Sequence, residues 1–150
     1  MKPIEVLKNL DLVCWPALFV GLQKGWVTKS DIADYATSLL SADLDNGDEN
    51  IAVLASADSF DDSEVKELLL QVGGSTAEPE AIEKWRLATL IALSDSALSE
   101  EEKIDKLQEL YAEFDYPEDM SSCSIYSQNS VDPLVAMSDV ISALKNKFTG

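Results

Sequence analysis

The stretch PEAIEKWRLATLIAL, residues 79–93, decides the fold class of this chain. Its proline suits the first turn of a helix, where the missing N–H is not needed. Apolar residues then follow at close spacing: Ile82, Trp85, Leu87, Leu90, Ile91 and Leu93. A helix that is apolar on most of its surface is buried. The stretch therefore predicts a central helix with Trp85 as a core anchor.

Helical periodicity continues on both sides of this stretch. Further helices are expected over about 3–12, 15–25, 28–40, 61–73, 99–114 and 132–148, with a short apolar segment at 51–57. Three helix N-caps are expected: Thr28 with Asp31, Asp61 with Glu64, and Ser99 with Glu102. The longest irregular piece is 115–131, in which 122–130 could be an extended loop or a short strand.

These elements predict an all-α fold. We expect a single domain over residues 1–150, with seven to eight helices packed as an irregular bundle or a short helical-repeat-like stack. No apolar stretch approaches the roughly 20 residues that span a bilayer, and residues 1–11 lack the pattern of a signal peptide. A cytoplasmic location is expected. Cys14 and Cys123 match no metal or redox spacing, which predicts two free thiols.

The sequence carries little that points to catalysis. Histidine is absent, which removes the commonest general base and metal ligand. No nucleophile elbow and no phosphate-binding glycine loop is present. Carboxylate pairs such as Glu118 and Asp119 could still support acid and base chemistry, as in glycosidases. We expect no enzyme activity and no cofactor, and a carboxylate-dependent hydrolase stays as an alternative.

One acidic stretch, DLDNGDE at residues 43–49, invites comparison with a calcium-binding loop. Such a loop needs glycine at position 6 and glutamate at position 12. Counted from Asp43, Gly47 falls at position 5 and Leu54 at position 12. The turn and the bidentate ligand are both missing, so no metal site is expected.

The charge is the most unusual property of the chain. Its 28 acidic and 11 basic residues give a net charge of −17, whereas solubility of a small domain requires a magnitude of only about 2 to 8. Such a charge repels nucleic acid and anionic membranes and attracts cationic partners. Self-repulsion also favours a monomer. No base lies between Lys29 and Lys66, an interval with ten acids, or between Lys106 and Lys145, an interval with seven.

We interpret these intervals as docking surfaces for a cationic protein, although charge runs are often only solvated faces. The hypothesis requires that the chain's own cations leave the carboxylates unpaired. Exposed aromatic or apolar side chains would supply the desolvated anchors. The candidate acids are Asp43, Asp45, Asp48, Glu49, Asp58, Asp61, Asp62, Glu118 and Asp119. The candidate anchors are Phe60, Tyr116, Met120 and Tyr126.

Two neighbouring stretches carry a resemblance to a known family: LVCWPAL at 12–18 and GLQKGWVT at 21–28, followed by Asp31 and Tyr35. They resemble a family of small bacterial helical domains without assigned activity that includes immunity proteins of polymorphic toxin and contact-dependent growth-inhibition systems. Its sharpest residues here are Trp15, Gly21, Gly25 and Trp26, which are packing and turn positions. The resemblance brings no catalytic motif.

The resemblance implies a cytosolic, non-enzymatic protein that neutralises a toxin domain, often a basic nuclease. Combined with the charge, it predicts a monomeric nuclease inhibitor that binds its cognate toxin in a 1:1 complex. The expected toxin is an RNase. The acids would cover the phosphate-binding cleft, and opposite charge would speed capture. An acidic chaperone or adaptor for another secreted protein, which would bind extended segments, is the alternative.

Overall fold

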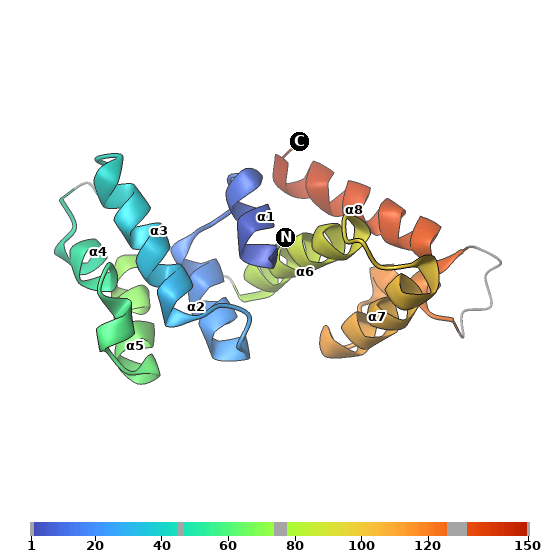
Figure 1. The fold of residues 1–150 in the computed structure, drawn as a ribbon, viewed down its shortest axis with the longest axis horizontal. Helices are drawn as coiled ribbons and strands as arrows, with labels where there is room; N and C mark the ends of the chain where they lie inside the picture. Colours follow the sequence, from blue (N-terminus) through green and yellow to red (C-terminus); the bar gives the residue numbers. More distant parts are fainter. Residues whose placement is uncertain (1, 45–46, 74–77, 126–131, 150) are drawn as a thin grey trace. The chain divides into compact units, whose positions relative to one another are not determined.

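The computed structural model describes residues 2–44, 47–73, 78–125 and 132–149 (Figure 1). Within these ranges the chain forms eight α-helices and two short 3₁₀ helices, and none of these residues is in a strand. The predicted all-α class is confirmed. Contacts divide the chain into two compact units: unit 1 is residues 1–12 and 83–150, and unit 2 is residues 13–82. The single domain and its mode of helix packing stay predictions.

Unit 2 contains four α-helices and one 3₁₀ helix. They are α2 (Trp15–Lys24), α3 (Lys29–Ser41), α4 (Glu49–Leu54), η1 (Ala57–Ser59) and α5 (Asp62–Gly73). α2 packs against α5, α3 packs against α4 and η1, and α4 packs against α5. Fully buried side chains at helical spacing form its core, among them Leu18, Ile32, Leu54, Val65 and Leu69. The acidic interval between Lys29 and Lys66 therefore folds around one small core.

Unit 1 contains α1 (Pro3–Asn9), most of α6 (Glu78–Ser94), α7 (Glu100–Glu113), η2 (Glu118–Cys123) and α8 (Pro133–Thr149). α8 packs against η2 and α7, and α7 also contacts η2. Gln108 of α7 secures the end of η2. Its Nε2 donates to the Cys123 carbonyl at 2.9 Å, and its Oε1 accepts from the Ile125 N–H at 3.1 Å. Glu118 and Asp119 thus lie on an anchored turn.

The stretch that predicted a central helix forms α6. Trp85, Leu87, Ala88 and Leu90 are completely buried, which confirms the prediction and the role of Trp85 as a core anchor. Arg86 is buried as well, with 5% of its surface exposed, and it is the one charged residue buried in the described part of the chain. Hydrophobic periodicity gave no indication of it.

The helix N-caps read from the sequence are present. The Thr28 hydroxyl accepts from the Asp31 N–H at 3.2 Å, and the Asp31 carboxylate accepts from the Thr28 N–H at 3.0 Å. The Ser99 hydroxyl accepts from the Glu102 N–H at 3.2 Å at the start of α7. Each bond satisfies an N–H that the first helical turn leaves without an intrahelical partner.

Two boundaries differ from the prediction. α1 ends at Asn9, three residues before its expected end at Leu12, because Asp11 adopts the left-handed conformation with φ 57°. The piece 115–131 is not wholly irregular, since residues 118–123 form η2. Of residues 122–130, for which the sequence allows an extended loop or a short strand, 122 and 123 belong to η2, 124 and 125 are not in a strand, and 126–130 lie outside the described residues. No helix in the described ranges has both the length and the apolar character needed to cross a membrane.

Three helices end at an aspartate in the left-handed conformation, where glycine is usual. These residues are Asp11 (φ 57°), Asp43 (φ 57°) and Asp115 (φ 63°). After α3, the Asp43 N–H donates to the Leu40 carbonyl at 3.2 Å, which closes the helix. The next N–H, of Leu44, donates to the Leu39 carbonyl at 2.8 Å. A Cβ is unfavourable in this conformation, and the helix dipole disfavours a negative charge at a C-terminus. Glycine would therefore be more stable at these positions.

We predict that Asp43→Gly raises the free energy of unfolding by about 0.5–1 kcal/mol, after allowance for the larger entropy of glycine in the unfolded chain. Asp34→Gly is the matched control, because it removes an equal charge from the middle of α3. There glycine costs roughly 0.3 kcal/mol relative to aspartate. Urea denaturation measures both. A loss of stability in both variants would contradict the role given to Asp43.

Candidate functional site

The predicted docking residues lie in both units. Unit 2 holds Asp43, Asp48, Glu49, Asp58, Phe60, Asp61 and Asp62, and unit 1 holds Tyr116, Glu118 and Asp119. Asp45 and Tyr126 lie outside the described residues. The predicted docking residues therefore form one group in unit 2 and another in unit 1.

Unit 2 is the more acidic in proportion to its size. Residues 13–82 include thirteen acids and three lysines, Lys24, Lys29 and Lys66, and no arginine. Of the described docking acids in this unit, only Asp62 is paired with a lysine, Lys29, at 3.9 Å. The chain's own cations leave the other described docking acids of unit 2 uncompensated. This satisfies the requirement that the docking hypothesis placed on this unit.

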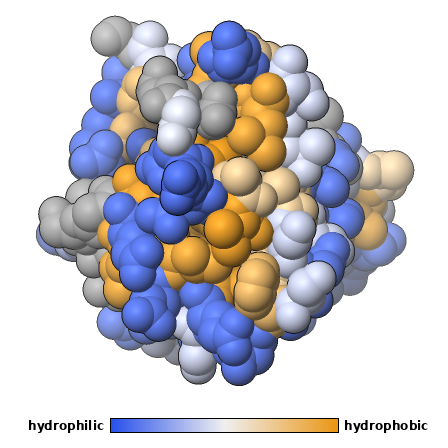
Figure 2. Space-filling model, turned by 90° about the vertical axis from the view of Figure 1, so that its left-hand side faces the viewer, coloured by the Kyte–Doolittle hydropathy of each residue, from blue (hydrophilic) through white to orange (hydrophobic). Residues whose placement is uncertain are grey.

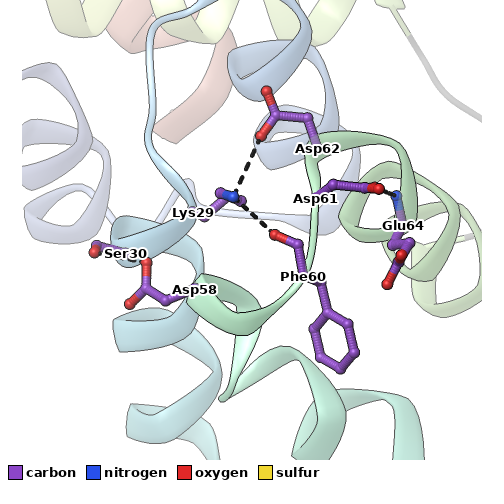
Figure 3. Close-up of polar contacts among 7 residues, drawn as sticks. All are labelled: Lys29, Ser30, Asp58, Phe60, Asp61, Asp62 and Glu64. Atoms are coloured by element: carbon purple, nitrogen blue, oxygen red, sulfur yellow. Dashed lines mark hydrogen bonds and ion pairs between the residues drawn. The ribbon is translucent and has the colours of Figure 1, made fainter.

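Lys29 organises the acidic turn between η1 and α5 (Figure 3). Its Nζ donates to the Phe60 carbonyl at 2.7 Å, and the neighbouring Ser30 hydroxyl donates to the Asp58 carboxylate at 2.9 Å. The start of α3 thereby holds residues 58–62. Figure 3 shows the Phe60 ring pointing away from Lys29. The hydrogen bond from Lys29 to the Phe60 carbonyl therefore orients the Phe60 backbone so that its ring projects away from Lys29.

Several of the predicted docking acids also have local structural roles. The Asp61 carboxylate accepts from the Glu64 N–H at 2.9 Å, which confirms the predicted cap of α5. The Asp48 carboxylate accepts from the Asn50 N–H at 2.9 Å at the start of α4. A capping carboxylate near a helix N-terminus is stabilised by the helix dipole and keeps its negative charge at the surface. These acids can cap a helix and contribute to the surface charge together.

An apolar groove adjoins the turn. It encloses about 220 Å³ and is lined by Val53, Phe60, Glu64, Glu67, Leu68 and Gln71. Figure 2 faces the side on which α3, α4 and α5 lie in Figure 1, and it shows apolar surface with hydrophilic atoms on either side. Unit 2 also exposes Leu44, Val53 and Leu70, with 61%, 37% and 42% of their surface accessible. Neither periodicity nor motifs predicted the groove, because its walls come from three successive elements.

The acids of unit 1 are partly compensated. Asp119 accepts a hydrogen bond from Arg86, whose side chain is 6% exposed, whereas that of Asp119 is 49% exposed. A buried guanidinium requires a counter-charge. Asp119 is therefore not the uncompensated docking charge that the sequence suggested. Glu118 is exposed, and no described cation is paired with it.

A second pocket, of about 240 Å³, lies in unit 1. Its walls come from η2 and α8, and they consist of Asp119, Ser122, Ala136, Asp139, Val140 and Ala143. It brings together two carboxylates, as a carboxylate-dependent hydrolase requires. One of the two is already held by Arg86. The sequence did not predict this pairing, because Asp119 and Asp139 belong to different elements.

The cysteines are both free of disulfides, as predicted, with Cys14 half-buried and Cys123 buried. Burial and, to a smaller extent, the negative charge of Asp119 raise the pKa of the Cys123 thiol to about 11, and Arg86 opposes the shift. The reactive form of cysteine is the thiolate. Cys123 is therefore protonated at neutral pH and serves as a core residue.

The predicted aromatic and apolar anchors differ in their exposure. Tyr116 is 62% exposed, and its ring lies edge-on to Tyr111 with centroids 5.1 Å apart. Phe60 is half-buried and lines the groove. Met120 is completely buried, so the prediction of an exposed anchor there is wrong. The formation of η2 turns its side chain into the core.

The residues that carried the family resemblance have packing and turn roles, as predicted. The Trp15 ring lies edge-on to Tyr35 with centroids 5.1 Å apart. Gly25 ends α2 with φ 79°, a conformation that favours glycine. The Trp26 N–H donates to the carbonyl of buried Gly21 at 2.7 Å. These four residues stabilise the first helix of unit 2 and its end.

The fold and the surface define a small, strongly acidic, all-α protein. Residues 4–148 match the model of a family described as an uncharacterized protein conserved in bacteria (DUF2247), and the chain belongs to that family. No curated protein and no solved structure matches the chain. A bacterial family without assigned activity is the coarser part of the resemblance described above, and it is confirmed. Membership of immunity proteins in it stays a prediction.

We predict that Lys29→Met lowers the free energy of unfolding by about 1–2 kcal/mol. It removes a charged donor from the Phe60 carbonyl, and the long contact with exposed Asp62 adds little. Lys24→Met is the control, because it removes the same charge from the exposed last turn of α2. Urea denaturation of both variants gives the comparison. Equal effects would mean that Lys29 acts only through its charge.

Proposed function

We propose that this protein is an immunity protein that binds and neutralises a cognate basic toxin domain, in a 1:1 complex in the bacterial cytoplasm. The observation that carries the proposal is the acidity of unit 2, which its three lysines do not offset, beside an apolar groove. Charge alone gives long-range attraction, whereas affinity requires desolvated apolar contacts as well. Unit 2 has both within residues 43–71.

The mechanism is electrostatic capture followed by occlusion. A nuclease binds phosphates with a basic cleft, and carboxylates displayed on a rigid helical surface can occupy the same positions. Opposite charge raises association rates toward about 10⁸–10⁹ M⁻¹s⁻¹ at low salt, which suits an inhibitor that must act before the toxin reaches RNA. The turn held by Lys29 and the start of α4 present these carboxylates.

A second candidate function, a carboxylate-dependent hydrolase, is favoured by one observation. The pocket in unit 1 contains Asp119 and Asp139. We rank it lower because Arg86 already binds Asp119, and removing Asp119 from that bond to take part in a reaction would leave a buried guanidinium without a counter-charge.

The proposal predicts that an adjacent reading frame encodes a secreted toxin with a basic C-terminal domain, and the test uses that domain. We predict that the purified toxin domain forms a stoichiometric complex with the protein and loses its nuclease activity. A variant with Asp43→Asn, Glu49→Lys and Asp58→Asn should associate at least tenfold more slowly at low salt and show a weaker salt dependence. Asp95→Asn, Glu101→Gln and Asp105→Lys change the charge of unit 1 by the same amount and should have a smaller effect.

Three results would separate the alternatives. Full nuclease activity in the presence of excess protein, with no complex, would contradict the proposal. A complex formed only with the unfolded toxin domain would favour a chaperone or adaptor. Equal decreases in the association rate for the two charge variants would show that the interface is not confined to unit 2.

A further inference from the structure

We propose that the groove of unit 2 receives one helix of the basic partner, which places an apolar side chain in the groove and, beside it, arginine or lysine residues that face Glu64 and Glu67. The inference rests on the proposed function, because it names the contact segment of that same partner. It is carried by the geometry of the groove, its charge and the backbone chemistry of its walls.

The size of the groove fits a single large side chain. An apolar cavity of about 150 Å³ in another protein accommodates a benzene molecule. The groove encloses about 220 Å³, and Val53, Phe60 and Leu68 supply its apolar walls. A branched aliphatic or aromatic side chain can therefore enter it and be partly removed from water. Such a buried anchor is the kind of contact that dominates binding energy at interfaces.

The charges at the margin of the groove specify the residues beside that anchor. Glu64 and Glu67 line the groove from α5, both are exposed, and neither is paired with a cation among the described residues. Lys66 lies between them in the sequence, but residues one or two positions apart on a helix do not face each other. A cation of the partner is needed to compensate the two glutamates next to the buried anchor.

The walls of the groove favour a helix over an extended segment. Extended peptides bind by adding main-chain hydrogen bonds to the edge of a sheet. The groove is instead lined by α4, α5 and the turn between them, and the helix interiors use their N–H and carbonyl groups internally. A helical segment brings its own backbone bonds and lays one face into a groove.

The direction of the groove also suits a helix. Its residues on α5 are 64, 67, 68 and 71, which is the i, i+3, i+4, i+7 stripe of one helix face. That stripe extends over roughly 10 Å. Glu64 and Glu67 lie toward the N-terminal end of this stripe, so a partner helix with an apolar residue opposite Leu68 and cations within about one turn on one side of that residue matches it.

The first experiment uses two synthetic peptides of about 15 residues with the same composition. One places a leucine and two arginines on the same helical face, and the other places the leucine and the arginines on opposite faces. Titration into the full chain, followed by amide NMR shifts, should give at least tenfold tighter binding of the first peptide, with shifts centred on residues 53, 60 and 64–71. Equal affinities, or shifts spread over α3, would overturn the inference.

The second experiment uses matched variants with the first peptide and with the toxin domain. Leu68→Ser should weaken binding at least tenfold, whereas Leu70→Ser, on the same helix but outside the groove, should change it less than twofold. Glu67→Gln should weaken binding more than Asp34→Asn does, although each removes one charge. Denaturation curves of both leucine variants establish that each is folded. Equal effects within either pair would overturn the inference.

These outcomes are distinguishable from failure of the proposed function. A toxin domain that binds all variants with the affinity of the unchanged protein refutes the groove and leaves the immunity function in place. Absence of any complex with the toxin domain refutes the immunity function, and the peptide comparison then decides whether the groove binds a basic helix.

Discussion

Mutual repulsion among carboxylates is the constraint on which the structure of unit 2 depends. Thirteen acids share residues 13–82 with three lysines, so folding brings together charges that the unfolded chain keeps apart. The packing of α2 against α5 and of α3 against α4 has to outweigh that repulsion. Lys29 supports the most acidic part of this unit, because it holds the turn in which Asp58, Asp61 and Asp62 lie close together in sequence.

The same constraint links stability to function. Aspartate at the end of α3 is less favourable than glycine, and the acids around η1 need a lysine to hold them. Residues that are locally unfavourable, with no stabilising contact within the protein to offset them, are expected at functional sites. A cationic partner would supply the missing compensation. The groove beside these acids, with its exposed margin of Glu64 and Glu67, gives such a partner an apolar contact as well.

The fold could be predicted from the sequence to a large extent, and the site only in part. The density of apolar residues in α6 predicted its burial, and local capping by Thr28, Asp61 and Ser99 marked three helix starts. Those signals are local. The pairing of Arg86 with Asp119 and the groove formed by Val53, Phe60 and Leu68 join residues from different elements, and no local pattern reports them. The prediction that Met120 is exposed was wrong for the same reason, since its burial depends on the packing of η2.

The most direct test of the account is amide hydrogen exchange of the protein, alone and with the toxin domain. The account predicts that exchange slows in α4, η1 and α5, residues 49–73, where the acidic turn and the groove lie. Slower exchange confined to unit 1, or an unchanged pattern in a stable complex, would contradict the claim that unit 2 is the docking surface.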